Sequence, residues 1–114
     1  MLSPSLVQEL LAFRKARDWE QFHNLRTLST SLVLECSELM ELTQWAGDQD
    51  VAKIAQSKSE AIQDEIADIA ILLTYLAIDL RIDVDVAVRH KLAKNELKYP
   101  VEKARGVSTK YDKL

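Results

Sequence analysis

The chain has few of the residues that interrupt helices or cross-link a fold. Its 114 residues include two glycines, two prolines and one cysteine. So little glycine and proline favours long helices over a turn-rich β fold. The single cysteine, Cys36, cannot form a disulfide within the chain, which is typical of a protein from a reducing compartment. We therefore expect an all-α, cytoplasmic protein.

The chain also lacks a long uncharged segment and a strong charge of one sign. The longest run without a charged residue is the ten residues Ile69–Ile78, which is too short to span a bilayer. The first residues, Met-Leu-Ser-Pro, show no basic and apolar signal pattern. The formal net charge is -3, so no general attraction to nucleic acid or to an anionic membrane is expected. We expect neither as a partner.

What the chain does have is enough apolar sequence for one folded domain. Apolar residues make up 47% of the chain. Apolar spacings of three and four residues, with capping residues before them, predict four main helices and a short link or helix over 48–56. They run over 4–17, from 25 to about 47, from 57 to about 80, and from 83 to 99. We expect one all-α domain over residues 1–100 and a polar, mobile tail over 101–114.

Local capping signals define the predicted helix ends. Ser3-Pro4, Asn24 and Asp83 are suited to helix starts, and Ser57-x-x-Glu60 fits a capping box. Gly47 suits a helix end, and Tyr99-Pro100 should stop the last helix.

The predicted third helix is apolar on nearly all sides between Ile69 and Ile78. Such a helix is normally covered from several directions, and one small chain offers few residues for this. We therefore expect a helical bundle that assembles as a homo-oligomer, a dimer or a tetramer, with this helix central to the interface.

Two pairs of carboxylates interrupt the apolar pattern. Glu35 and Glu38 are three residues apart, as are Glu65 and Asp68, so each pair shares one face of its helix. Both pairs lie beside apolar stripes. If the second and third helices pack antiparallel, the four carboxylates should converge. Half-buried carboxylates need compensation, because burying an unpaired charge costs several kcal/mol.

Oxygen ligands of this kind suit Mg²⁺, or Mn²⁺ in its place. A di-iron site would use Glu-x-x-His pairs, but the fourth residues here are Glu38 and Asp68. The competing interpretation is that these are solvated charges or ion pairs with lysine and arginine, as surface carboxylates usually are.

Other polar and aromatic residues could meet a substrate. Lys91, Asn95 and Lys98 share one face of the last helix and could hold phosphate oxygens, although a solvated basic face is the alternative. Trp45 lies seven residues beyond Glu38, so it is expected above it on the same helical face, where it could stack on a base or simply pack.

The connector between the first two helices is rich in aromatic residues. Trp19, Phe22 and His23 lie close together there, and ordinary packing is the alternative to a binding role. We interpret Cys36 as a core residue and not as a nucleophile.

Together these segments resemble the all-α nucleoside triphosphate pyrophosphohydrolases of the MazG-like superfamily. The resemblance is greatest to the single-domain branch that includes dCTP pyrophosphatase. It rests on the segments RDWEQFH, LxxECSELMELTQW, DEIADIAILL and KLAKNELKYP, and it covers roughly residues 10–106. The motif is Glu-x-x-Glu, a spacer of 26 residues, then Glu-x-x-Asp. Many members have two successive glutamates at the start of this motif, whereas Leu34 precedes Glu35 here.

The resemblance implies a role for each group of residues. Glu35, Glu38, Glu65 and Asp68 would bind Mg²⁺. Among them we choose Glu38 as the candidate general base, with Glu35 as the alternative. Phosphates would meet Lys91, Asn95 and Lys98, while the base and sugar would lie near Trp19, His23 and Trp45.

The implied reaction converts a nucleoside triphosphate, expected to be a deoxyribonucleotide, into the monophosphate and pyrophosphate, which would cleanse the nucleotide pool. Three alternatives stay open: a non-catalytic helical oligomer or adaptor, a helical DNA-binding protein, and a phosphoribosyl-ATP pyrophosphohydrolase of the same superfamily. DNA binding would need a concentrated basic face, which only the last helix approaches.

Overall fold

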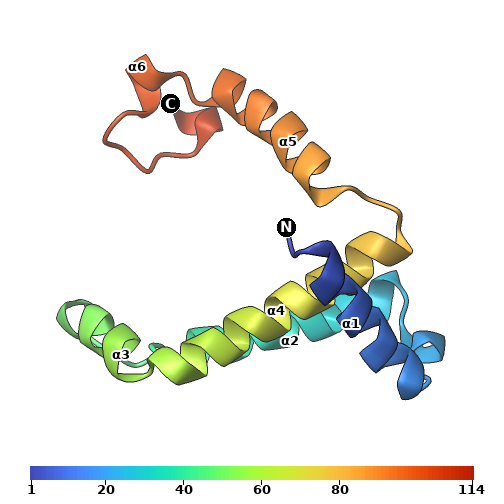
Figure 1. Ribbon diagram of the computed structural model, residues 1–114. Helices are drawn as coiled ribbons and strands as arrows, with labels where there is room; N and C mark the ends of the chain where they lie inside the picture. The colour runs from blue at the N-terminus through green and yellow to red at the C-terminus, as the bar shows by residue number, and fades with distance from the viewer. The chain divides into compact units, whose positions relative to one another are not determined.

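The computed structural model describes residues 1–114, and all of its regular elements are helical (Figure 1). The prediction of an all-α protein is therefore confirmed. The α-helices are α1 (Pro4–Ala16), α2 (Leu25–Glu41), α3 (Val51–Ser57), α4 (Ser59–Asp79), α5 (Val84–Lys98) and α6 (Val101–Ala104). The short 3-10 helices are η1 (Glu20–Phe22), η2 (Asp48–Asp50) and η3 (Tyr111–Lys113). None of these helices combines the length and the apolar character that a membrane span requires.

The chain forms two compact units. The first comprises Leu2–Arg81, with helices α1 to α4, and the second comprises Ile82–Leu114 together with Met1. The four longest helices are α1, α2, α4 and α5, which match the four predicted ones. That these four form one bundle stays a prediction.

Side-chain caps start α1 and α2 where the sequence predicts them. Ser3 accepts a hydrogen bond from the backbone N–H of Leu6, and Pro4 occupies the first helical position. At α2, the Asn24 side chain accepts from the N–H of Thr27, while the Thr27 hydroxyl accepts from the N–H of Asn24. Each cap satisfies donors that the first turn of a helix leaves unpaired.

The start of α4 differs from the predicted capping box. Lys58 precedes the helix, and no side chain caps it. The Ser57 hydroxyl instead donates to the carbonyl of Ile54, one turn back in α3. Ser57 therefore belongs to the last turn of α3, a helix that leaves only Lys58 between itself and α4.

The core of the first unit lies where α2 and α4 pack side by side (Figure 1). The two helices run antiparallel because α3 joins them at one end. Leu28 from α2 is 1% exposed, and Tyr75 and Ala77 from α4 are also buried. Complete burial of one leucine contributes about 1.5–3 kcal/mol. Helix α1 also packs against α4.

The apolar run of α4 is covered within the chain more completely than predicted. Every residue from Ile69 to Ile78 is buried or half-buried. Large apolar side chains that are more than half exposed occur on α2 instead, at Val33, Leu34 and Met40. Cys36 is exposed as well, so its interpretation as a core residue is wrong. The α2 face that meets α4 follows Leu28, Leu32, Glu35 and Leu39, and Cys36 lies beside this face.

The second unit is built around α5. The Asp83 carboxylate accepts a hydrogen bond from the N–H of Val86, which confirms the predicted cap, and α5 ends before Tyr99-Pro100 as expected. Tyr111 from η3 packs edge-on against the ring of Tyr99. Residues 101–114 thus contain α6 and η3, while the mobility of this segment stays a prediction.

Candidate functional site

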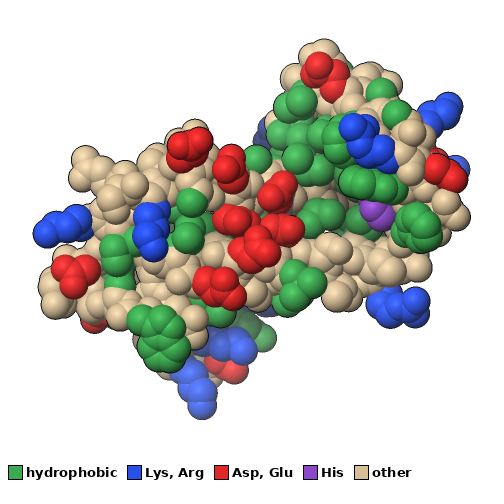
Figure 2. Space-filling model, turned by 90° about the horizontal axis from the view of Figure 1, so that it is seen from below, with side chains coloured by type: hydrophobic (Ala, Val, Ile, Leu, Met, Phe, Trp, Pro, Cys, Tyr) green, Lys and Arg blue, Asp and Glu red, His purple; other side chains and the backbone are tan.

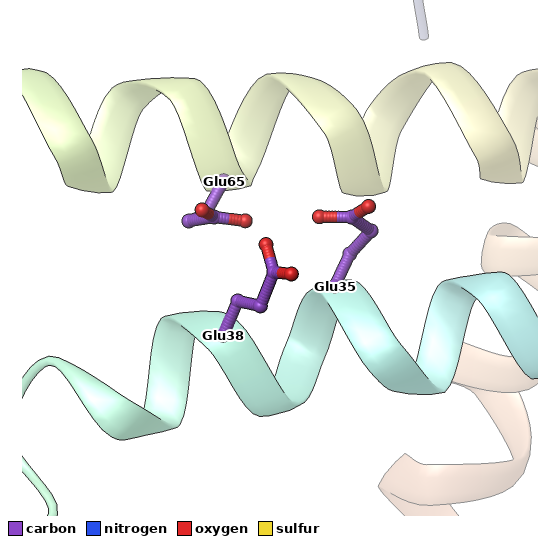
Figure 3. A group of neighbouring side chains, drawn as sticks. All are labelled: Glu35, Glu38 and Glu65. Carbon is purple, nitrogen blue, oxygen red and sulfur yellow. The ribbon is translucent and has the colours of Figure 1, made fainter.

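Three glutamates from two helices gather between α2 and α4. Figure 3 shows Glu35 and Glu38 extending from α2 and Glu65 extending from α4 into the space between the helices. One carboxylate oxygen from each lies within 4.8 Å of the others. On the face seen in Figure 2, acidic side chains gather in one central group. Antiparallel packing of α2 and α4 therefore brings these carboxylates together, as the sequence predicts.

Two of these carboxylates have oxygens that nothing in the chain satisfies. Oε2 of Glu35 and Oε2 of Glu65 are both buried without a hydrogen-bond partner. Buried polar atoms are normally paired, so each such atom calls for a specific explanation. The first unit places no lysine or arginine in a salt bridge with them. The interpretation as ordinary ion pairs therefore has no support at Glu35 or Glu65.

The electrostatics of the cluster oppose full ionisation. Burial, the close approach of the Glu35 carboxylate and the nearby charge of Glu38 raise the pKa of Glu65 to about 7. Burial also raises the pKa of Glu35, and the charges of Glu38 and Asp68 add to this effect. Carboxylates that approach one another resist deprotonation unless a cation compensates them. The cluster could hold a divalent metal ion, because it offers several oxygen ligands in one place.

Asp68 lies one turn beyond Glu65 on α4, and its side chain is exposed. It does not belong to the tight group of three, but it lies near enough to Glu35 to influence the pKa of that carboxyl group. Asp68 and Glu35 also line a cavity of about 280 Å³. The fourth carboxylate of the motif thus borders the same cavity as Glu35.

The cavity joins the carboxylates to an aromatic surface. Its lining includes both acidic and aromatic side chains: Phe13, Trp19, His23, Glu35, Asp68 and Tyr75. The predicted connector residues Trp19 and His23 therefore share a cavity with two predicted metal ligands. Phe13 and Trp19 pack edge to face, with ring centroids 5.7 Å apart. A planar group of a ligand could lie against such rings.

Trp45 is placed differently from the prediction. Helix α2 ends at Glu41, and Trp45 lies in the turns that follow it. The prediction that Trp45 stands over Glu38 on one continuous helical face is therefore wrong. The indole is 89% exposed and is not among the residues that line the cavity.

The predicted phosphate-binding residues lie in the second unit. Lys91, Asn95 and Lys98 are all on α5, where the two lysines are exposed and Asn95 is half-buried. The Lys98 ammonium lies 4.7 Å from the ring centroid of Tyr111, a cation–π contact. Their role toward phosphate stays a prediction.

One group beside the cavity was not found from the sequence. Arg14 is 5% exposed and forms two hydrogen bonds of 2.9 Å with the carboxylate of Asp79, at the end of α4. Its guanidinium also lies 4.6 Å from the ring centroid of Tyr75. A signal was present, because Arg14 continues the spacing of four set by Leu6 and Leu10 on the apolar face of α1.

A model of the MazG-like family matches residues 30–114. The chain belongs to the MazG-like family. It is 44% identical over 104 residues to dCTP pyrophosphatase 1 of Bos taurus and 42% identical to that of Homo sapiens. These alignments cover 90% of the chain but only 62% and 61% of the two relatives.

A solved structure supports the helical fold of this MazG-like chain. It is the crystal structure of a pyrophosphatase from Archaeoglobus fulgidus, with 33% sequence identity and a TM-score of 0.82. The match covers 84% of this chain and 90% of the archaeal one.

Proposed function

We propose that this MazG-like protein hydrolyses a nucleoside triphosphate, expected to be a deoxyribonucleotide, to the monophosphate and pyrophosphate. The observation that carries the proposal is the group of Glu35, Glu38 and Glu65, with two buried oxygens that no protein group satisfies. The relatives named dCTP pyrophosphatase 1 support the same reaction and suggest dCTP as the first substrate to test. Such an activity would remove unwanted nucleotides from the pool.

The carboxylate cluster fits a divalent cation, and we infer Mg²⁺, with Mn²⁺ as a substitute. Glu35, Glu38, Glu65 and Asp68 would hold it, since hard oxygen ligands are what this ion prefers. When bound, Mg²⁺ supplies positive charge to phosphate oxygens and makes water easier to deprotonate. A site of neutral or nitrogen ligands would have suited other metals better.

Side chains of this protein would carry out the proton transfer and bind the phosphates. Glu38 is the exposed member of the cluster, so it can accept the proton of a water molecule that attacks the α-phosphorus; Glu35 is the alternative. The new bond joins the water oxygen to the α-phosphorus, and the bond to the bridging oxygen of the pyrophosphate breaks. Lys91, Asn95 and Lys98 would bind the phosphates, and the two lysines would offset the leaving charge.

Trp19 and His23 would contact the base or sugar, because they line the cavity that also contains Glu35 and Asp68. We retain Trp45 as a further base contact, supported by its large exposed ring.

We also infer a homo-oligomer, a dimer or a tetramer, in a reducing cytoplasm. Support comes from the exposed apolar side chains of Val33, Leu34 and Met40 on α2. Light scattering at micromolar concentration tests this inference, and a monodisperse monomer would contradict it.

One assay tests the proposed activity. The protein is incubated with Mg²⁺ and, in separate reactions, each of the ribo- and deoxyribonucleoside triphosphates and phosphoribosyl-ATP, and pyrophosphate and phosphate are measured separately. The proposal expects pyrophosphate, with a deoxyribonucleotide as the best substrate. Hydrolysis of phosphoribosyl-ATP alone would favour the other superfamily activity. No hydrolysis, together with no Mg²⁺ binding at the cluster, would favour a non-catalytic adaptor.

A further inference from the structure

The hydrogen bond between Arg14 and His23 determines which imidazole nitrogen carries the hydrogen. Nη1 of Arg14 lies 3.3 Å from Nδ1 of His23. A guanidinium group has donors only and does not lose its charge in proteins. Nδ1 must therefore accept, so it carries no hydrogen. A neutral imidazole with a bare Nδ1 has its hydrogen on Nε2.

Asp79 fixes the guanidinium that makes this contact. Its two carboxylate oxygens accept from Nη1 and Nη2 of Arg14, each at 2.9 Å. Such a two-point pair sets both the position and the plane of the guanidinium. One hydrogen of Nη1 then points to Asp79 and the other to His23. Tyr75 supports the arrangement, because its ring lies against both Arg14 and His23.

The surroundings of His23 favour the neutral ring. Partial burial and the positive charge of Arg14 lower the pKa of His23, whereas the charges of Asp79 and Glu20 oppose this more weakly. A neutral ring whose only lone pair is engaged by Arg14 cannot take a proton from a ligand. It can only offer the Nε2 hydrogen.

We propose that Arg14, anchored by Asp79, is a positioning residue that holds His23 in the tautomer with hydrogen on Nε2. The imidazole then serves the cavity as a hydrogen-bond donor and not as a base. Because His23 lines this cavity, the group that it recognises is an acceptor oxygen or nitrogen of the nucleoside part of the substrate. This last step rests on the proposed function, whereas the tautomer itself does not.

Nuclear magnetic resonance of the imidazole nitrogens tests the tautomer directly in the full chain, without nucleotide or metal. The chain has only two histidines, and the exposed His90 on α5 is an internal reference. At neutral pH, Nδ1 of His23 should show the shift of an unprotonated nitrogen and Nε2 that of a protonated one. The nitrogens of His90 should show averaged shifts. Hydrogen on Nδ1 of His23, or averaging like that of His90, would overturn the proposal.

Two substitutions test whether Arg14 and Asp79 cause this state. Arg14→Lys keeps the charge but loses the two-point geometry, and Asp79→Asn removes the anchor. Both should move the His23 shifts toward the averaged pattern. Arg26→Gln, at an exposed arginine on α2, is the matched control and should leave them unchanged. His23 shifts that stay the same in both variants would show that Arg14 does not position the ring. Should both variants unfold, the wild-type spectrum still decides the tautomer.

Kinetics connect the tautomer to the substrate. Asp79→Asn should raise KM for dCTP about tenfold, equivalent to about 1.4 kcal/mol, with a smaller change in kcat. Hydrolysis of inorganic triphosphate, which has no base or sugar, should change little. An equal loss on both substrates would contradict a role toward the nucleoside. If the wild-type protein releases no pyrophosphate, the proposed function fails while the tautomer remains tested by the spectra.

Discussion

Helix α4 contributes to two groups of charged side chains that differ in how their charge is compensated. At its C-terminal end, Asp79 meets the buried Arg14, and both carboxylate oxygens accept hydrogen bonds. Nearer its start, Glu65 meets Glu35 and Glu38, and two buried oxygens have no partner. One group has opposite charges supplied by the chain, and the other has only like charges.

The difference shows which group is complete without a ligand. At the Arg14 end, only Nε of the guanidinium lacks a hydrogen-bond partner. At the glutamate end, burial and the neighbouring carboxylates raise the pKa of Glu65 to about 7. Without a cation, the repulsion between these carboxylates is therefore reduced by protonation of Glu65. We infer that the first group shapes the cavity, and that the second is built to receive a cation from outside.

The largest expected effect comes from removing ligands at the glutamate end. Glu38→Gln and Asp68→Asn should each lower pyrophosphate release by more than about 100-fold, since even residues behind metal ligands cost 10–100-fold. Circular dichroism should show an unchanged helical fold. Glu41→Gln and Asp64→Asn, which alter exposed neighbours on the same helices, are the matched controls. Near-normal turnover of both site variants would remove the metal assignment.

A substitution of Trp45 tests whether the base of the nucleotide binds at Trp45 or in the cavity near Arg14. Trp45→Ala should raise KM for the best nucleotide about ten- to a hundred-fold, because base stacking is worth about 1–3 kcal/mol. The indole is 89% exposed, so the free energy of unfolding should hardly change. Inorganic triphosphate provides the control without a base. An unchanged KM, together with a raised KM for Trp19→Ala, would place the base at the Arg14 end instead.

Removing one partner at the compensated end should destabilise the fold. Arg14→Met leaves the Asp79 carboxylate without its donors, so the free energy of unfolding should fall by about 1–3 kcal/mol. The estimate stays below that for a fully buried pair because the Asp79 side chain is 31% exposed. Urea unfolding measures the change, and Arg26→Met is the control. A loss no larger than that of the control would mean that the pair contributes little.

Local sequence rules were sufficient for most of the helix ends. Asn24 and Asp83 cap as predicted because each needs only its own next three residues. Ser57 does not cap α4 as predicted, because it still belongs to the last turn of α3. Where α3 ends depends also on the residues before Ser57. The convergence of Glu35, Glu38 and Glu65 was predictable because antiparallel neighbours leave few ways to arrange two helical faces.

Other features depend on contacts that no local spacing contains. Arg14 lies on the apolar face of α1, so the sequence indicates a buried charge that needs a partner. It does not indicate which residue that partner is, because Asp79 lies 65 residues away in the chain. Cys36 was misplaced because its position beside the apolar stripe of α2 does not decide whether another helix covers it, and Trp45 was misplaced because α2 stops at Glu41. The face that α4 covers, and the end of α2, are set by tertiary packing.

The most direct test of the contrast between the two groups is the stability of the metal-free protein against pH, with and without Mg²⁺. The folded-state pKa of Glu65, about 7, lies above its ordinary value of 4.5, so the folded protein binds more protons in this window. The contribution of Glu65 should therefore be fully present below pH 4.5 and be lost as pH rises through about 7. Mg²⁺ should restore stability above that pH, because it binds the deprotonated carboxylates of the folded state. Glu65→Gln should remove both the loss and the rescue, whereas Asp64→Asn should keep them. A wild-type protein whose stability neither falls across this window nor rises with Mg²⁺ would contradict the account.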